Sequence, residues 1–250
     1  MSGHNKWAKI KRKKGVTDAK RGRLFTRISK EMTIAARDGG GSIQGNPRLR
    51  LAVEKAQAAN MPADNIKRAI QKGTGELPGV IYDEVTYEGY GPGGVALIIE
   101  SVTDNKNRTV AEIRHLLEKY NGKMGAANSV SYMFHKKGII SVPSSAFGED
   151  ELMGIILDAG ADDMRTEDDA YQIVTAPENF GSVKMALEAK GIKLEDAEVQ
   201  RIPENMVRVD GKEAESVLKL MEALEDNEDI QHVYSNFDID EKILASFNAD

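Results

Sequence analysis

Up to residue 73, apolar residues recur every three or four positions, which is the spacing of one face of a helix. Helices are predicted over residues 17–37, 46–60 and 62–73, because each segment opens with a good capping residue or a proline and glycines or prolines lie between them. Residues 1–16 are almost all polar or basic and offer no apolar face. We therefore expect a basic arm followed by a small domain of three amphipathic helices.

The spacing of the apolar residues changes after residues 74–79, a segment that is rich in glycine and proline. Beyond it, apolar and polar positions alternate, which is typical of strands. Strands are predicted at residues 83–90 and 95–103, and a helix over residues 109–120 starts with a capping-box sequence. Alternating apolar positions at residues 130–134 predict a further strand. Residues 74–79 are thus expected to be a hinge between two domains.

Residues 135–203 predict, in order, a strand, a helix, two strands, a helix and a strand, which is the ferredoxin-like pattern. The segments on either side of residues 135–203 do not each form a complete α+β domain. After residue 203, a strand, a helix and a strand are predicted at residues 206–209, 212–224 and 230–239. The predicted fold class is therefore α+β multidomain, with an N-terminal three-helix domain followed by two ferredoxin-like α+β domains, one inserted in the other. The predicted domains are residues 1–76, basic and helical with an N-terminal arm; residues 77–134 plus 204–250, discontinuous and α+β; and residues 135–203, the inserted ferredoxin-like domain.

Charge divides the chain into a basic head and an acidic body. Residues 1–72 carry 18 Lys and Arg against 5 Asp and Glu, whereas the remaining residues carry 16 against 35, for a net charge of −6. Such an asymmetry indicates a polyanionic partner for the head, either nucleic acid or an anionic membrane surface. The density of basic side chains around an aromatic residue favours nucleic acid.

Several classes of chemistry are excluded or disfavoured. The chain has no cysteine, which excludes thiol nucleophiles, disulfides and cysteine-ligated metals. The four histidines, His4, His115, His135 and His232, are far apart and lack zinc-site spacing. The acidic residues between 158 and 169 do not match a calcium loop, and no nucleophile-elbow sequence occurs. We predict no enzymatic activity, no metal, no cofactor and no small-molecule substrate.

The sequence also predicts a cytoplasmic protein without a membrane partner. The basic N-terminal residues are not followed by the apolar segment of a secretory signal. The longest apolar run, at residues 95–99, is far shorter than the roughly 20 residues that span a bilayer.

Two loops could bind a ligand. Gly91, Pro92, Gly93 and Gly94 lack the ending of a phosphate-binding loop and join two predicted strands, which favours a turn. The polar loop at residues 104–109 lies between a strand and a helix N-terminus. An elaborate helix cap is the favoured interpretation of this second loop. The alternative is an anion or RNA contact, whose predicted residues are Asn105, Asn107 and Arg108.

The strongest candidate site is the basic stretch in the first 30 residues. Such a density of lysine and arginine neutralises phosphates and gives affinity without sequence information. Trp7, the only tryptophan, either stacks on an unpaired base or anchors the arm to the helical bundle, and its large apolar area slightly favours the anchor. The predicted nucleic-acid-binding residues are Lys6, Trp7, Lys9, Lys11, Arg12, Lys13, Lys14, Lys20, Arg21, Arg23, Arg27 and Lys30.

Several motifs stand out along the chain: Gly3-His4-Asn5-Lys6-Trp7, Asp18-Ala19-Lys20-Arg21-Gly22, Asn46-Pro47-Arg48-Leu49-Arg50, Asn60-Met61-Pro62, Tyr87-Glu88-Gly89-Tyr90-Gly91-Pro92-Gly93-Gly94 and Asp104-Asn105-Lys106-Asn107-Arg108-Thr109. Together they resemble the YebC family, whose bacterial members are classed as probable transcriptional regulators and which has a mitochondrial relative, the translational activator of cytochrome c oxidase. The resemblance covers essentially the full length. It implies a helical N-terminal domain, two α+β domains, no enzymatic activity and cytoplasmic control of gene expression. The sequence departs slightly from the usual pattern of the YebC family at residues 121–125 and 128–130.

The resemblance implies two possible activities. One is ribosome binding that helps translation through difficult sequences such as proline runs, and the other is DNA binding at promoters. A promoter reader needs a recognition helix and usually dimer symmetry, neither of which the sequence indicates. A ribosomal-RNA binder needs only a basic arm and a helical head of suitable shape. We therefore expect a ribosome-associated translation factor, with a DNA-binding transcriptional regulator as the alternative and a protein-interaction scaffold as a third, weaker possibility.

Overall fold

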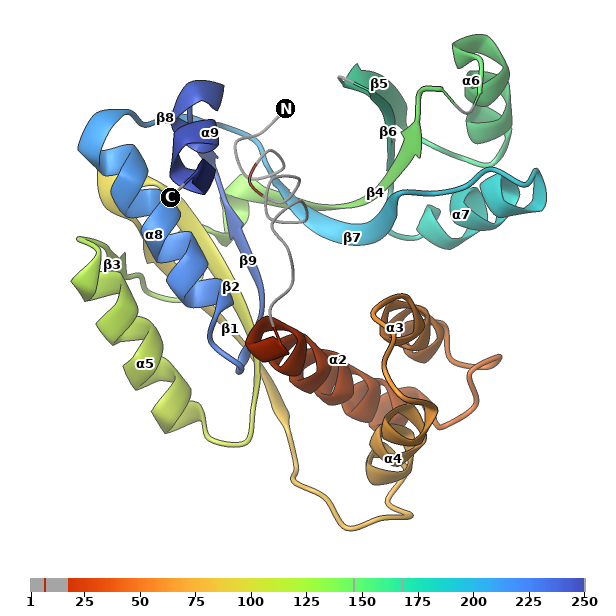
Figure 1. The fold of residues 1–250 in the computed structure, drawn as a ribbon, viewed down its shortest axis with the longest axis horizontal. Coiled ribbons are helices and arrows are strands. Elements are labelled where there is room, and N and C mark those ends of the chain that lie inside the picture. Colours follow the sequence, from red (N-terminus) through yellow and green to blue (C-terminus); the bar gives the residue numbers. More distant parts are fainter. Residues whose placement is uncertain (1–6, 8–17, 146, 168, 250) are drawn as a thin grey trace. The chain divides into compact units, whose positions relative to one another are not determined.

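The computed structural model describes residue 7 and residues 18–145, 147–167 and 169–249 of the chain, and Figure 1 shows its fold. The described residues form two compact units. One comprises residues 132–206, and the other comprises the chain on either side of that segment. An insertion of one α+β unit within another, as the pattern predicts, is confirmed. The boundary predicted near residue 76 stays a prediction, because the N-terminal helices and the first sheet belong to the same unit.

The three N-terminal helices predicted from periodicity are present as α2 (Asp18–Gly39), α3 (Pro47–Ala58) and α4 (Ala63–Gly73). Helices α3 and α4 both pack against α2 (Figure 1). Their apolar stripes meet in a core that includes the fully buried side chains of Met32, Leu49 and Ala56. Burial of a side chain as large as Met32 or Leu49 contributes about 1.5 to 3 kcal/mol. The helical domain is thus held together by its own small core.

Asn46 connects two of these helices. Its side-chain oxygen accepts a hydrogen bond from the Leu49 amide at 3.0 Å, as the predicted N-cap of α3. Its side-chain amide donates to the carbonyls of Ala35 (2.7 Å) and Gly40 (2.9 Å) at the end of α2. One buried residue therefore starts α3 and satisfies carbonyls that α2 leaves open at its C-terminus.

The larger unit also contains a four-stranded antiparallel sheet in the order β3-β1-β2-β9. Leu97 and Ile99 of its central strand β2 pack into a core shared with α5 and α8, which cover one face of the sheet (Figure 1). The central strands β1 and β2 are joined directly through the short 3₁₀ helix η1 (Pro92–Gly94). The remaining elements are β1 (Asp83–Tyr90), β2 (Ala96–Thr103), α5 (Lys106–Lys119), β3 (Lys123–Met124), α8 (Gly211–Glu225) and β9 (Ile230–Ser235).

Residues 132–206 form the predicted ferredoxin-like domain. Its antiparallel sheet has the order β5-β6-β4-β7, and two helices complete the unit. Ile140, Ile173 and Val183 are fully buried in its core. The elements are β4 (Phe134–Pro143), α6 (Glu149–Asp158), β5 (Asp163–Glu167), β6 (Ala170–Thr175), α7 (Phe180–Ala189) and β7 (Asp196–Pro203).

Three local predictions were wrong, and one helix was not predicted. The helix predicted to start at residue 109 begins at Lys106, because Asn105 and not Thr109 caps it. The strand predicted at residues 130–134 is the 3₁₀ helix η2 (Ser131–Met133) followed by β4. The strand predicted at residues 230–239 divides into β9 and β10 (Phe237–Asp238), and β10 pairs in parallel with β8 (Val207–Arg208). The C-terminal helix α9 (Glu241–Ala249) was not predicted.

None of the helices in the described ranges is long and apolar enough to cross a membrane.

Candidate nucleic-acid interface

The basic residues of α2 point toward acidic groups of the same unit. Arg23 pairs with Asp226 at 3.1 Å, and the Arg27 guanidinium donates to the backbone carbonyl of Glu225 at 3.2 Å. Desolvation lowers the pKa of Arg27, although Glu225 and Asp226 act in the opposite direction. These two arginines, which were predicted to contact phosphate, therefore connect α2 to the C-terminal end of α8.

Lys30 is buried against acceptors of its own unit. Only 7% of this residue is exposed, and its ammonium group donates to the carboxylate of Asp229 at 2.6 Å and to the carbonyls of Val102 and Glu228. All three donor hydrogens are therefore used inside the protein. Helix periodicity did not predict these contacts, because it does not show which face of α2 another part of the chain covers, and nucleic-acid binding by Lys30 stays a prediction.

Asp229 is the centre of this buried network. Its second carboxylate oxygen accepts hydrogen bonds from Arg108 at 2.7 Å and from the hydroxyl of Thr109 at 2.8 Å. Burial alone would raise the pKa of Asp229, but hydrogen bonds from Lys30, Arg108 and Thr109 outweigh it and lower the pKa to about 2. Asp229 is therefore a buried anion whose charge is balanced by two cations from distant elements.

The polar loop at residues 104–109 forms an elaborate helix cap. The Asn105 side chain accepts a hydrogen bond from the Arg108 amide at 3.1 Å, and the Arg108 guanidinium bridges Asp104 and Asp229. Asn107 is exposed. The structure thus shows the helix cap that the sequence analysis favoured. An RNA contact through Asn105, Asn107 and Arg108 stays a prediction.

Trp7 anchors the chain, but not where we expected. Its side chain is 3% exposed, its indole N–H donates to Glu225 at 3.1 Å, and its ring centroid lies 5.9 Å from that of Phe247. The residue joins the core beside α8 and α9 and not the core of the three-helix bundle. A buried indole has no face available for a base, so Trp7 would have to leave this core before a base could stack on it.

The other predicted arm residues, Lys6, Lys9, Lys11, Arg12, Lys13 and Lys14, lie outside the described residues. Lys20 and Arg21, in the first turns of α2, both interact with other groups of the protein. The structure therefore brings Arg23, Arg27 and Lys30 together at an internal interface and leaves the contribution of the arm as a prediction.

A different basic face lies on α4. Lys67, Arg68 and Lys72 are exposed, and none of them makes a hydrogen bond or ion pair with a described residue. The sequence signal was present, since Ile66, Ala69 and Ile70 form the buried side of α4 and leave these cations on its other faces. The sequence analysis predicted α4 as a helix but assigned the nucleic-acid contacts to the first 30 residues and not to the basic face of α4.

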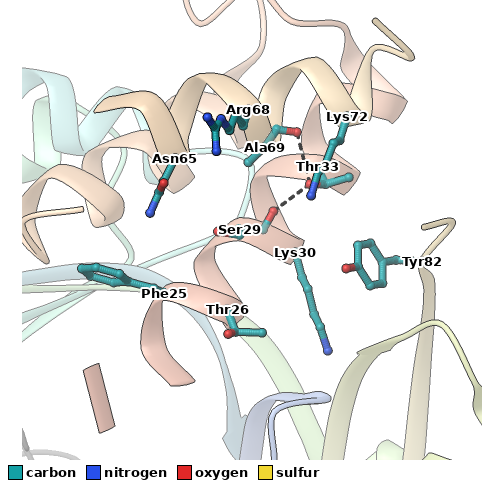
Figure 2. Close-up of a pocket in the computed structure, with 10 residues that line it drawn as sticks. All are labelled: Phe25, Thr26, Ser29, Lys30, Thr33, Asn65, Arg68, Ala69, Lys72 and Tyr82. Carbon is teal, nitrogen blue, oxygen red and sulfur yellow. Dashed lines mark hydrogen bonds between the residues drawn. The ribbon is translucent and has the colours of Figure 1, made fainter. Parts of the chain in front are cut away.

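A groove between α2 and α4 adjoins this face (Figure 2). It has a volume of about 390 Å³. Thr33 ties its two walls together, because its hydroxyl lies 2.8 Å from the Ser29 carbonyl on α2 and 3.2 Å from the Ala69 carbonyl on α4. None of the ten lining residues is acidic; they are Phe25, Thr26, Ser29, Lys30, Thr33, Asn65, Arg68, Ala69, Lys72 and Tyr82.

Tyr82 borders the groove from the segment that leads into β1, as Figure 2 shows. Its backbone carbonyl accepts a hydrogen bond from Arg37 at 2.6 Å, and the Lys30 ammonium lies 5.6 Å from its ring centroid. Burial, together with the negative charges of Asp104 and Asp229, raises the pKa of the Tyr82 hydroxyl. Two cations of α2 thus hold this aromatic ring at the edge of the groove.

Comparison with protein families covers both parts of the chain. Residues 5–76 match a model of the TACO1/YebC protein N-terminal domain, and residues 82–237 match a model of the TACO1/YebC second and third domain. The chain belongs to the TACO1/YebC family. The resemblance inferred from the sequence motifs is confirmed, and the junction between the two family models at residues 77–81 coincides with the segment between α4 and β1.

TACO1/YebC relatives from several bacteria match over nearly the whole chain. A probable transcriptional regulatory protein of Geobacter sulfurreducens is 57% identical over 96% of this chain and 96% of its own length. One of Dictyoglomus turgidum is 54% identical over 99% of this chain and 100% of its own length. A crystal structure of a conserved hypothetical protein from Aquifex aeolicus superposes with a TM-score of 0.82 at 45% identity, over 91% of this chain and 94% of the other.

Among the described residues, no group of three or more His, Asp or Glu side chains is arranged to hold a metal ion. His115 lies exposed on α5, whereas Ile113 and Leu117 of the same helix are buried.

Proposed function

We propose that this protein is a non-enzymatic, cytoplasmic regulator of gene expression that binds nucleic acid through its N-terminal domain. We further propose that the polymer is ribosomal RNA and that the protein acts on the ribosome, easing elongation through difficult sequences such as proline runs. The names of the relatives support the coarser part of this proposal, since they describe probable regulatory proteins. The choice of RNA rests on the chemistry of the helical domain.

The proposal of RNA rests on the hydrogen bonds that most arginines of the helical domain make within the protein. Arg23, Arg27, Arg37, Arg48 and Arg50 all donate to carboxylates or carbonyls of the protein itself. A protein that reads sequence in the major groove presents several side chains to base edges, whereas adjacent cations on one helix contact phosphates without reading sequence. Arg68 and Lys72, which lie one turn apart on the exposed side of α4, therefore support binding to the phosphate backbone of RNA.

One observation favours the alternative, a DNA-binding transcriptional regulator. Helices α3 and α4 are joined by residues 59–62, a connection of the length found in helix-turn-helix motifs, and Asn60 has a positive φ of 58° in this turn. In this structure, however, α3 and α4 each pack mainly against α2. The geometry therefore gives weaker support to major-groove recognition than to phosphate contact.

The proposal is tested by co-sedimenting the full-length protein with ribosomes and by titrating it on promoter-length duplex DNA over a salt series. We expect ribosome association that persists at physiological salt, while DNA binding weakens steeply and without sequence preference. A variant with charge reversal at Lys11, Arg12, Lys13 and Lys14 should lose nucleic-acid binding and retain its fold by circular dichroism. Sequence-selective DNA binding without ribosome association would establish the alternative.

A further inference from the structure

We propose that the groove between α2 and α4 binds a single unpaired nucleotide, with its phosphate held by Arg68 and Lys72 and its base against Tyr82. This inference rests on the proposed function, because it names the contact through which the helical domain would hold RNA. It assigns the contact to a groove that lies away from the basic arm and from Trp7.

The electrostatics of the groove favour an anion. Arg68 and Lys72 are four residues apart on α4, so both side chains lie on the helix face that lines the groove. Neither is neutralised by a described carboxylate, and the lining contains no acidic residue although the chain carries a net charge of −6. Figure 2 shows both side chains extending from α4 at the rim of the groove. A phosphate would supply the counter-charge that the protein does not provide here.

The remaining groups of the groove match a nucleobase. The Tyr82 ring is held in place by Lys30 and by the Arg37 hydrogen bond to its backbone, yet no described residue hydrogen-bonds its hydroxyl. Asn65 lies one turn before Arg68 on the same face of α4 and carries both a donor and an acceptor. An aromatic ring with an adjacent amide is the combination that proteins use to stack and hydrogen-bond an unpaired base.

The dimensions favour a single strand. A volume of about 390 Å³ lies in the range of small-molecule sites, and such a groove cannot admit a duplex. Its walls are also fixed: a Cβ atom at Gly73 would lie 2.3 Å from the Thr33 carbonyl, which shows how closely α4 approaches α2. A preformed groove of this kind takes a splayed nucleotide with little ordering cost.

The test is fluorescence anisotropy of the full-length protein with a labelled, unstructured oligouridine. Arg68→Ala, Lys72→Ala and Tyr82→Ala should each weaken binding about tenfold, the effect of losing one charge-assisted contact or one stacked base. Tyr82→Phe keeps the ring and should retain most of the affinity. Lys67→Ala is the matched control, because Lys67 is an exposed cation of the same helix that does not line the groove. Circular dichroism establishes that each variant is folded.

Competition distinguishes the possible ligands. Unlabelled single-stranded RNA and, at higher concentration, uridine monophosphate should displace the probe, whereas inorganic phosphate and duplex RNA should do so poorly. Equal displacement by inorganic phosphate would reduce the groove to a simple anion site and overturn the nucleotide assignment. Equal displacement by duplex RNA would overturn the single-strand assignment.

The failures of the two proposals can be separated. If the native protein binds ribosomes and oligouridine and the groove variants bind equally well, the groove inference is wrong while the proposed function stands. Equal losses of affinity in Lys67→Ala and Arg68→Ala would also overturn the groove inference, since any cation of α4 would then be sufficient for RNA binding. If the native protein binds neither ribosomes nor RNA, the proposed function fails and the groove inference fails with it. Photocrosslinking of an oligonucleotide containing 4-thiouridine should label Tyr82 or its neighbours, and labels confined to residues 1–17 would contradict the assignment.

Discussion

The ammonium group of Lys30 lies 2.6 Å from the carboxylate of Asp229, although 199 residues separate them in the chain. Both side chains are more than 90% buried. This ion pair joins α2 to the turn that precedes β9, and thus joins the first helix of the N-terminal domain to the last strand of the first sheet. Lys30 would be available to bind phosphate if it were exposed, but in this structure it forms an ion pair within the protein.

Replacement of Lys30 by alanine should destabilise the fold by about 3 kcal/mol, because it leaves the carboxylate of Asp229 with one fewer buried cation. Urea denaturation measures this change. Arg23→Ala is the control, since the Arg23–Asp226 pair is partly exposed and should contribute less than about 1 kcal/mol. Equal effects of the two variants would show that burial does not strengthen the Lys30–Asp229 pair.

The pKa of Asp229 predicts a loss of stability in acid. In the native state the pKa of Asp229 is about 2, below the ordinary value of 3.8 for an aspartate, so the unfolded chain takes up a proton at a higher pH than the folded protein does. The stabilisation from this group, about 2 kcal/mol, is therefore present above pH 4 to 5 and is lost as the pH falls toward 2. The free energy of unfolding measured over this range should vary less steeply in Asp229→Asn than in the native protein. Parallel curves would contradict the assignment.

Trp7 gives a direct optical test of its buried position. As the only tryptophan, it accounts for the whole indole fluorescence of the chain. Because its ring is covered by Phe247 and its N–H is bonded to Glu225, saturating single-stranded RNA should leave its emission essentially unchanged. Strong quenching would show that Trp7 leaves this site and stacks on a base. Trp7→Ala should cost about 3 kcal/mol or more of stability, as expected for a buried aromatic side chain.

Glu88 stabilises the loop that leads out of the larger unit. Its carboxylate is buried and accepts hydrogen bonds from the backbone amides of Asn128 (2.8 Å), Val130 (2.6 Å) and Ser131 (3.0 Å). Burial would raise the pKa of Glu88, but these amides lower it. Glu88→Ala should leave three donors without a partner and cost about 3 kcal/mol, with Glu88→Gln less severe. Amide hydrogen exchange at residues 128–131 should accelerate in Glu88→Ala; unchanged protection would contradict this role.

Two helical glycines should respond to alanine in opposite directions. A Cβ at Gly73 would lie 2.3 Å from the backbone carbonyl of Thr33, so Gly73→Ala forces α4 away from α2 and should destabilise the fold by about 2 kcal/mol. A Cβ at Gly22 meets nothing within 4 Å, and Gly22→Ala should stabilise α2 by up to about 1 kcal/mol. Thermal unfolding of both variants tests the pair. Similar shifts of the melting temperature would show that the α2–α4 contact can relax.

Local signals located most of the fold. Asn46 followed by Pro47 predicted the start of α3, and the order of strands and helices in residues 135–203 was sufficient to predict the ferredoxin-like unit. These features depend on neighbouring residues, so a single sequence carries them. Thr109 shows the limit: its sequence fits a capping box, but its hydroxyl bonds Asp229, which lies 120 residues away, and Asn105 caps the helix instead.

The sequence by itself determined the element pattern, the separation of charge and, through its motifs, the family. Only the tertiary structure decided which cations are available to a partner, because the basic side chains of α2 donate to carboxylates and carbonyls that the chain contributes 198 to 203 residues later. Periodicity identifies the apolar face of a helix, but it does not show which polar face a second domain will cover. The long-range contacts of Arg23, Arg27 and Lys30 could therefore not be predicted from the sequence of α2.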